Sequence, residues 1–293
     1  MQTVTSSQVA GLNIELDFEL PPSPTSGTLP AVVYIHGGGI VAGGRRDALF
    51  PEWPRDHRLV YPSTGFDIID DMKALFAFLA SPALNEKHLP AGLSLDANRI
   101  AIMGTSGGGY VARVAALYAH PKPRATFSLF RTGGDILSDH WVAPKEAHSP
   151  FPQAERVTAE TVAPAGAPTP GRVLQPIIVH GGWPVSAKLR VLPFKERLAA
   201  IPMHLRPAVL EANIGASFPP TVLVHGLADD VVPPSESQAT YDQLKELGVK
   251  AEFITVPRAV HGLQLVDDQT QMAPGAEEAL ERAMQFLEEE LRK

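Results

Sequence analysis

The stretch of sequence that decides the fold is Arg99-Ile-Ala-Ile-Met-Gly-Thr-Ser-Gly-Gly, residues 99–108. It joins an apolar run, typical of a strand covered on both faces, to a G-x-S-x-G turn centred on Ser106. An apolar helix pattern follows at residues 110–117. A strand, a tight glycine turn and a helix in this order form a nucleophile elbow, because the turn lifts the serine hydroxyl above the sheet at a helix N-terminus. We therefore predict that Ser106 is a nucleophile.

Apolar runs of the same kind recur along the chain, with helical patterns between them. The runs lie at residues 31–35, 125–130, 221–224 and 252–256, after an alternating strand at residues 12–20. The clearest helical patterns lie at residues 66–79 and 276–291, the second with an apolar face of Leu280, Ala283, Met284, Leu287 and Leu291. This alternation implies right-handed βαβ units and an α/β fold with a mostly parallel, twisted sheet flanked by helices. Ligands bind beyond the carboxyl ends of such strands.

A second glycine motif, His36-Gly37-Gly38-Gly39, follows the apolar run at residues 31–35. It matches the HGGG type of oxyanion hole, in which the backbone N–H groups of Gly38 and Gly39 point into the site. The N–H group of Gly107, next to the nucleophile, is the expected third donor. The stretch also fits G-x-G-x-x-A of a nicotinamide-cofactor site. That alternative is disfavoured because Gly43 and Gly44 would open its helix, at a cost of about 1 kcal/mol each.

Two further strand ends supply an acid and a base. Residues 225–233 read His-Gly-Leu-Ala-Asp-Asp-Val-Val-Pro, and His261 follows the next apolar run. The chain order Ser106, Asp229, His261 is that of α/β hydrolases. In this chemistry the histidine takes the serine proton, and the aspartate holds the imidazole tautomer. Asp230 stays open as the acid, although we favour Asp229 because Asp230 is expected to face solvent or to cap the following turn.

These four motifs resemble those of the hormone-sensitive-lipase-like esterases of the α/β-hydrolase fold, from about residue 29 to the C-terminus. The resemblance implies a single α/β-hydrolase domain over residues 1–293 that cleaves carboxylic esters through an acyl-enzyme, without a cofactor. It also implies the role of each site residue. Ser106 would be the nucleophile, Asp229 the acid and His261 the base, with an oxyanion hole of Gly38, Gly39 and Gly107.

One segment departs from the family pattern. Residues 56–62, Asp-His-Arg-Leu-Val-Tyr-Pro, resemble the end of a family element, yet only residues 41–55 precede them after the HGGG motif. Pro51 and Pro54 limit any helix there to about residues 45–50, because proline cannot donate the helical hydrogen bond. The strand would shrink to residues 58–61. This shortening motivates an alternative function, a catalytically impaired protein of this fold that serves as a small-molecule binding receptor.

A proline-rich insertion is expected over residues 135–217. Thirteen of the 28 prolines fall within residues 144–220, among large apolar side chains such as Trp141, Phe151, Trp183 and Phe194. In the family such a segment forms a cap over the acyl pocket, and binding pockets are mainly apolar. We therefore expect a small ester substrate with a hydrophobic acyl or aryl group.

Composition and charge limit the partners, the location and the metal ions to be expected for this protein. The chain is 44% hydrophobic and 19% charged, with a net charge of −7 and no block of like charges, which argues against a nucleic-acid partner. It has no cysteine, and we find no signal peptide or membrane-length apolar run, so a cytoplasmic protein without stable membrane insertion is expected. A homodimer is possible but not required. The histidines lack metal-ligand spacing, so no metal is predicted; His180 is expected to be structural, while His36 and His225 brace their turns.

Overall fold

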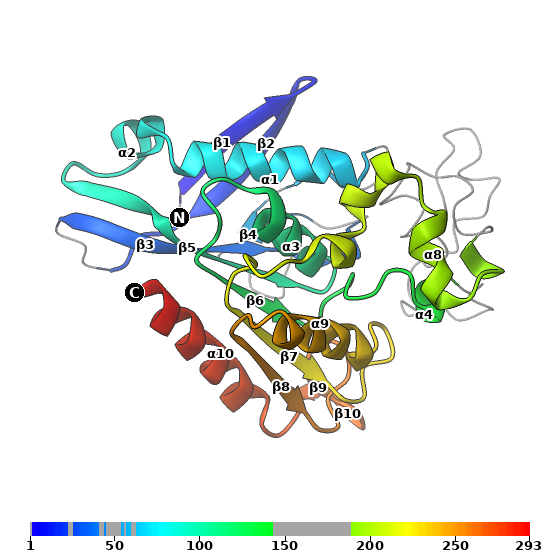
Figure 1. Ribbon diagram of the computed structural model, residues 1–293. Coiled ribbons are helices and arrows are strands. Elements are labelled where there is room, and N and C mark those ends of the chain that lie inside the picture. The colour runs from blue at the N-terminus through cyan, green and yellow to red at the C-terminus, as the bar shows by residue number, and fades with distance from the viewer. Residues whose placement is uncertain are drawn as a thin grey trace.

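The computed structural model describes residues 2–22, 26–40, 44, 54–55, 57–59, 63–142 and 189–293, with the backbone alone at residues 54–55. The described residues form a sheet of eight strands covered by helices (Figure 1). Its strands are β1 (Gln2–Val9), β2 (Leu12–Phe18), β3 (Gly27–Ile35), β4 (Pro54–Arg55), β5 (Leu93–Thr105), β6 (Ala125–Leu129), β7 (Thr221–Gly226) and β8 (Ala251–Val256). A separate pair, β9 (Gln264–Leu265) and β10 (Asp268–Met272), lies before the last helix.

The helices alternate with the later strands. They are α1 (Gly65–Leu79), α2 (Pro82–His88), α3 (Gly108–Tyr118), α4 (Asp139–Val142), α8 (Phe194–Ala200), α9 (Pro234–Glu246) and α10 (Ala276–Leu291). Two 3-10 helices, η1 (Met203–Ala208) and η2 (Leu210–Asn213), connect α8 to β7. The helices predicted at residues 66–79 and 276–291 and all five apolar strands are therefore confirmed, although β3 begins four residues and β5 six residues before the predicted runs.

The strand order is β1-β2-β4-β3-β5-β6-β7-β8. The five strands from β3 to β8 in this order are parallel, whereas β2 pairs antiparallel with both β1 and β4. Because the parallel strands run in one direction, their carboxyl ends meet at one edge of the sheet. The turns that hold Ser106, Asp229 and His261 all follow such ends.

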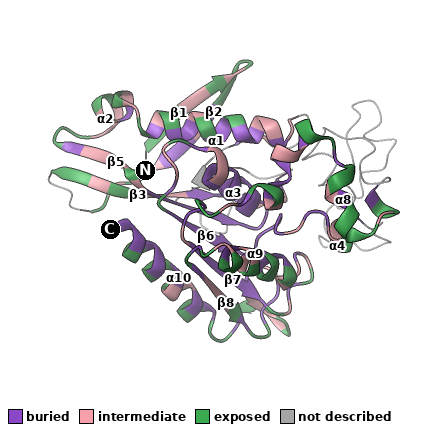
Figure 2. Cartoon of the chain, viewed as in Figure 1, coloured by how far each residue is buried: buried purple, intermediate pink, exposed green. Residues whose placement is uncertain are grey.

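The central strand β5 is apolar at residues 100–103 because both of its faces are covered there. Ile100 and Ile102 pack in one core with α1 and α3, while Ala101 and Met103 pack in a second core with α10. A further apolar cluster connects α9 to α3, since it includes Leu244 of α9 and Ala116 of α3. Figure 2 shows the buried side of each of these helices turned toward the sheet.

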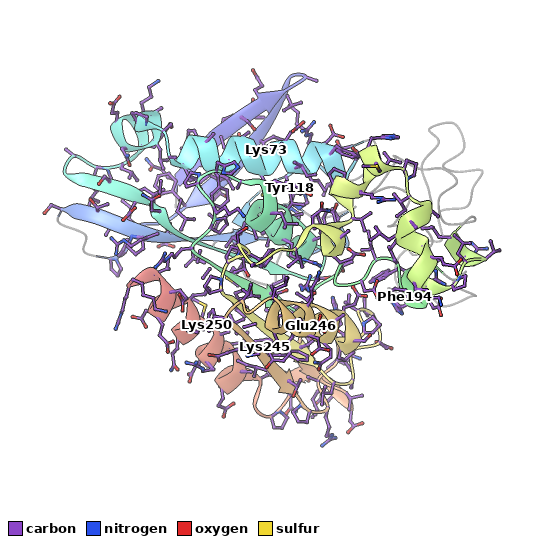
Figure 3. All side chains as sticks on the ribbon, viewed as in Figure 1. Lys73, Tyr118, Phe194, Lys245, Glu246 and Lys250 are labelled. Atoms are coloured by element: carbon purple, nitrogen blue, oxygen red, sulfur yellow. The ribbon has the colours of Figure 1, made fainter. Side chains whose placement is uncertain are left out.

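Helix α1 shows how the local sequence sets one element. The backbone N–H of Thr64 donates to the carboxylate of Asp67 at 2.7 Å, which satisfies a donor at the helix start. All six apolar residues on the predicted face are buried: Ile68, Ile69, Met72, Leu75, Phe76 and Leu79. The opposite face carries the exposed Asp70 and Lys73, the second of which is labelled in Figure 3.

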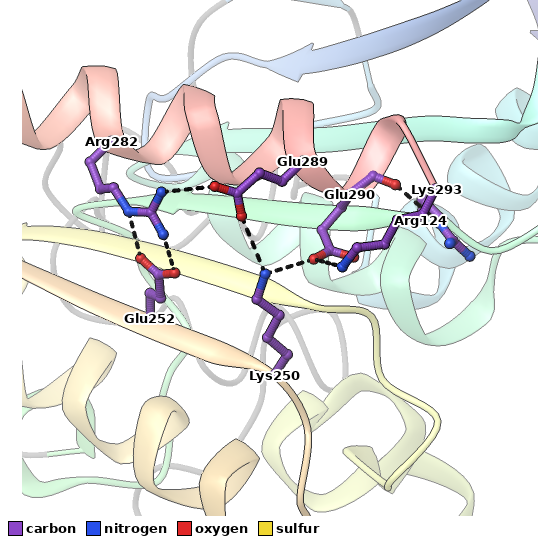
Figure 4. A network of polar contacts seen from close by, with 7 residues as sticks. All are labelled: Arg124, Lys250, Glu252, Arg282, Glu289, Glu290 and Lys293. Carbon is purple, nitrogen blue, oxygen red and sulfur yellow. Dashed lines mark hydrogen bonds and ion pairs between the residues drawn. The ribbon is translucent and has the colours of Figure 1, made fainter.

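The predicted apolar face of α10 needs a correction. Met284 is 40% exposed, and the buried face instead includes Ala279, Phe286 and Glu290. Glu290 lies inside because its carboxylate accepts hydrogen bonds from Lys250 at 2.8 Å and Lys293 at 2.7 Å (Figure 4). The burial of an ionised carboxylate is tolerated when it is paired in this way, and the pairing lowers the pKa of Glu290 even though burial opposes that shift.

The short strand predicted at residues 58–61 is wrong at residues 58–59, which lie outside any strand, while residues 60–61 lie outside the described residues. The strand is β4, two residues long, and it fills the place between β2 and β3. Arg58 lies outside the sheet because its backbone N–H and its Nε donate to the two oxygens of Asp71, each at 2.8 Å. Its Nη1 also donates to Asp67 at 2.8 Å, so Arg58 is bonded to α1. The predicted short helix at residues 45–50 lies outside the described residues.

The two ends of the predicted insertion pack on one another, whereas residues 143–188, including Phe151, His180 and Trp183, lie outside the described residues. A compact apolar cluster joins these ends: Ile136, Leu137, Val142, Leu189, Ile201, Leu205 and Val209. Phe66, at the start of α1, packs against it. The first residue of α8, Phe194, is 53% exposed at the edge of the molecule (Figure 3).

In the ranges that the structure covers, every helix is too short or too polar to cross a membrane.

Candidate active site

Ser106 lies in the turn between β5 and α3. Its backbone has a φ of +49°, a left-handed conformation that is uncommon for a residue with a side chain. The turn is held from both sides, because Ser106 N donates to Leu129 O at 3.0 Å and Thr132 N donates to Ser106 O at 3.0 Å. Strain of this kind persists only where neighbouring contacts determine the conformation, and it is common at functional sites.

The glycines on either side of Ser106 are required by close backbone contacts. A Cβ atom on Gly104 would overlap the carbonyl group of Gly108, and one on Gly108 would overlap the carbonyl oxygen of His36. A side chain at either position would therefore collide with the backbone of α3 or with the end of β3.

The structure brings Ser106, His261 and Asp229 together from three loops. His261 Nε2 lies 2.9 Å from Ser106 Oγ, and His261 Nδ1 lies 2.9 Å from Asp229 Oδ2. Phe130 supports the imidazole with an edge contact, at 4.8 Å between ring centroids. The hydroxyl, the imidazole and the carboxylate are thus hydrogen-bonded in series, so that His261 can accept the hydroxyl proton of Ser106.

Asp229 is buried and ionised. Burial raises its pKa, but hydrogen bonds from His225 and His261 and the charge effect of His261 outweigh burial, so the pKa falls to about 2. Its other oxygen, Oδ1, accepts the backbone N–H groups of Val231 at 3.0 Å and Val232 at 2.9 Å. Asp230, the open alternative, is exposed. Only Asp229 of this pair is hydrogen-bonded to His261 in the described residues.

Gly38 and Gly39 lie beside the nucleophile turn. Both have positive φ angles, +95° and +63°, and a Cβ atom on Gly107 would come within 2.7 Å of the Gly39 Cα. The backbone of Gly39 therefore lies against Gly107, the residue that follows Ser106. Within the ranges that the structure describes, the N–H groups of Gly38, Gly39 and Gly107 donate no hydrogen bond to protein atoms.

The remaining histidines have varied roles. His36 Nδ1 donates to Gly37 O at 2.8 Å, which confirms that His36 braces its turn, and its ring stacks on His57 at 4.7 Å. His225 contacts Val232 O in its own turn and, beyond the prediction, also contacts Asp229. In the described part of the chain, no group of three or more histidine, aspartate and glutamate residues is placed to hold a metal ion.

Two polar contacts were not predicted from the sequence. One is the bond between His225 and Asp229, for which the four-residue spacing was the available signal. The other is the bond between Arg58 and Asp71, which lie 13 residues apart with no local pattern to connect them.

Comparisons with known proteins agree with the fold. Residues 205–292 match the prolyl oligopeptidase family. A structure of the esterase Est2 from Thermogutta terrifontis with butyrate bound superposes with a TM-score of 0.61 at 19% identity, covering 98% of this chain and 93% of that one. An acetyl ester-xyloside bifunctional hydrolase from Caldicellulosiruptor lactoaceticus also gives 0.61, at 16% identity and 98% and 96% coverage. The chain therefore has an α/β-hydrolase fold.

Two proteins of similar sequence differ in how much of their own length this chain matches. A probable carboxylesterase M8 from a Phoma species is 28% identical, over 78% of this chain and 77% of its own length. The non-reducing polyketide synthase pkbA from Emericella nidulans is 25% identical over 99% of this chain, which spans only 14% of that synthase. Together with the family match, these similarities support a hydrolase function.

Proposed function

We propose that this protein is a serine hydrolase that cleaves carboxylic esters and is similar to the hormone-sensitive-lipase-like esterases. The observation that carries this proposal is the pair of 2.9 Å contacts linking Ser106, His261 and Asp229. Ester cleavage is favoured among hydrolase reactions because the relatives include a probable carboxylesterase and the structural neighbours include esterases.

The reaction begins at Ser106. Its oxygen attacks the ester carbonyl carbon while His261 Nε2 takes the hydroxyl proton, and Asp229 stabilises the resulting imidazolium. His261 then donates the proton to the alcohol oxygen as the carbon–oxygen bond breaks, which leaves an acyl-enzyme. A water molecule, deprotonated by His261, attacks the acyl carbon and releases the acid.

The negative oxygen of each tetrahedral intermediate is bound by the N–H groups of Gly38, Gly39 and Gly107. One such donor is worth roughly 2.7–4 kcal/mol in the transition state. This assignment is supported by the close contact of Gly39 with Gly107, next to Ser106, and by the absence of protein acceptors for these amides in the described residues.

The substrate is a small ester with a hydrophobic acyl or aryl group, and residues 135–217 form the cap over it. The apolar cluster at the ends of this segment, which reaches α1 through Phe66, supports a cap anchored near the carboxyl edge of the sheet.

The direct test compares the wild type with Ser106→Ala on p-nitrophenyl esters of increasing acyl length. We expect a fall in kcat of about six orders of magnitude, since removing a serine nucleophile has this effect in a related mechanism. Circular dichroism and thermal unfolding must show that both proteins are folded. The chain-length profile measures the size of the acyl pocket.

Failure of the folded wild type to hydrolyse any ester would contradict the proposal and would favour the alternative of a binding receptor. Equal turnover by the wild type and Ser106→Ala would also contradict it, because the measured activity would then not depend on the proposed nucleophile.

A further inference from the structure

His225 is a fully buried histidine that contacts the acid of the site without contacting Ser106. It lies near the end of β7, and its Nε2 is 3.1 Å from Asp229 Oδ2 and 2.8 Å from Val232 O. Its Nδ1 is 2.7 Å from the hydroxyl of Ser237, a buried residue of α9. Both ring nitrogens therefore have partners, and one of those partners is Asp229.

The contacts determine where the ring proton lies. The carbonyl oxygen of Val232 can only accept, so His225 Nε2 carries the hydrogen and shares it between Val232 O and Asp229 Oδ2. In the neutral ring Nδ1 is an acceptor, and the Ser237 hydroxyl donates to it.

The carboxylate of Asp229 accepts hydrogen bonds from four donors, one of which is His225. Two backbone N–H groups reach Oδ1, while His225 and His261 both reach Oδ2. A carboxylate bound on both oxygens cannot rotate freely, so Oδ2 stays directed at His261.

We propose that His225, oriented by Ser237, is a positioning residue that fixes the Asp229 carboxylate against His261. This inference rests on the proposed function, since positioning has a kinetic consequence only if Asp229 and His261 act on Ser106.

The kinetic test compares His225→Gln with His225→Leu. The glutamine amide can place an N–H donor near the position of Nε2, whereas leucine cannot donate. We expect His225→Leu to lower kcat by about 10²-fold, the effect of a misplacement of about 1 Å, with little change in KM. His225→Gln should recover most of the loss. A purely packing role predicts instead that leucine is tolerated at least as well as glutamine.

Ser237→Ala tests the second contact, with Ser235→Ala as the matched control because Ser235 is exposed on the same helix. Removing the Ser237 hydroxyl should lower kcat by several-fold, and removing the Ser235 hydroxyl should not. If His225→Leu fails to fold, this smaller substitution decides the question. Equal rates for the two alanine variants would then overturn the proposal.

A measurement on the full chain that needs no turnover separates this inference from the proposed function. Nitrogen-15 NMR of labelled histidines should show the Nε2–H tautomer for His225. A slowly exchanging Nδ1–H proton of His261 should be visible in the wild type and His225→Gln but lost in His225→Leu. An inactive wild type with these signals would contradict the ester-hydrolase function alone. An Nδ1–H tautomer of His225, or a His261 signal unchanged in His225→Leu, would overturn the positioning role.

Discussion

Asp229 and Asp230 are adjacent in the chain but have opposite environments. Asp229 is 5% exposed and accepts hydrogen bonds on both carboxylate oxygens, while Asp230 is exposed to solvent. The turn after β7 causes this difference, because it points one side chain toward His261 and the next one outward.

We expect Asp229→Asn to lower kcat by about four orders of magnitude, the effect of the equivalent change in a serine protease. The amide would favour the wrong imidazole tautomer. Asp230→Asn, an exposed change, should stay within about 2-fold of the wild type. Ester hydrolysis by the two purified variants checks this. The reverse result, with Asp230→Asn inactive and Asp229→Asn active, would show that the acid is Asp230.

The turn between β5 and α3 depends on backbone contacts too close for any side chain. Gly104→Ala would place a Cβ atom against the carbonyl of Gly108, so we expect a loss of more than about 4 kcal/mol in the free energy of unfolding. Gly248→Ala is a control: Gly248 has a φ of +71° but open space around it, so the expected loss is only about 1 kcal/mol. Denaturant unfolding measures both. Similar losses would contradict the contact argument.

The ends of the insertion are joined by one buried guanidinium as well as by apolar packing. Arg197 is 5% exposed and donates to Leu137 O at 2.6 Å and to Leu189 O and Leu192 O at 3.2 Å. These contacts connect α8 to the chain on both sides of residues 143–188.

Arg197→Met should therefore destabilise the protein by about 1–3 kcal/mol, because buried carbonyl groups lose their donor. It should also speed limited proteolysis within residues 135–217. The exposed Arg190, whose described contact is 3.4 Å from Val142 O, provides the control Arg190→Met. Equal proteolysis rates in the two variants would mean that Arg197 does not hold the ends together.

At the scale of the whole molecule, one buried carboxylic acid lies outside the three residues of the candidate site. Both carboxyl oxygens of Glu211, on η2, are buried without a hydrogen-bond partner in the described part of the chain. Burial raises the pKa of Glu211 from 4.5 to about 8, although the charge of Arg113 opposes the shift. The folded protein thus holds this proton more tightly than the unfolded chain does.

The sign of the resulting pH dependence follows from linkage. Since the folded state binds more protons between pH 4.5 and about 8, this group makes the free energy of unfolding decrease as the pH rises through that window. Glu211→Gln should remove the decrease and raise Tm by several degrees at pH 8.5. The control is Glu246→Gln, at an exposed position near the end of α9 (Figure 3). Parallel Tm profiles for the wild type and Glu211→Gln would contradict a raised pKa.

The order of strands and helices could be predicted from the sequence because it depends on local patterns. Continuous apolar runs mark strands covered on both faces, helical spacing marks α1, and glycines two residues on either side of Ser106 mark a turn where backbones touch. The meeting of Ser106, Asp229 and His261 also followed from local signals, since each residue comes directly after a parallel strand and such ends share one edge.

Other features were decided only by the tertiary structure. Arg58 is not in a strand, contrary to the prediction, because Asp71 of α1 binds both its backbone and its guanidinium. The strand that pairs with β3 at this edge is β4. Met284 faces outward because the position of α10 on the sheet selects which side is buried. The contact of His225 with Ser237 and Asp229 needed β7 and α9 in place. In each case the deciding partner lies on another element, and the orientation of two packed elements is not encoded in the periodicity of either one.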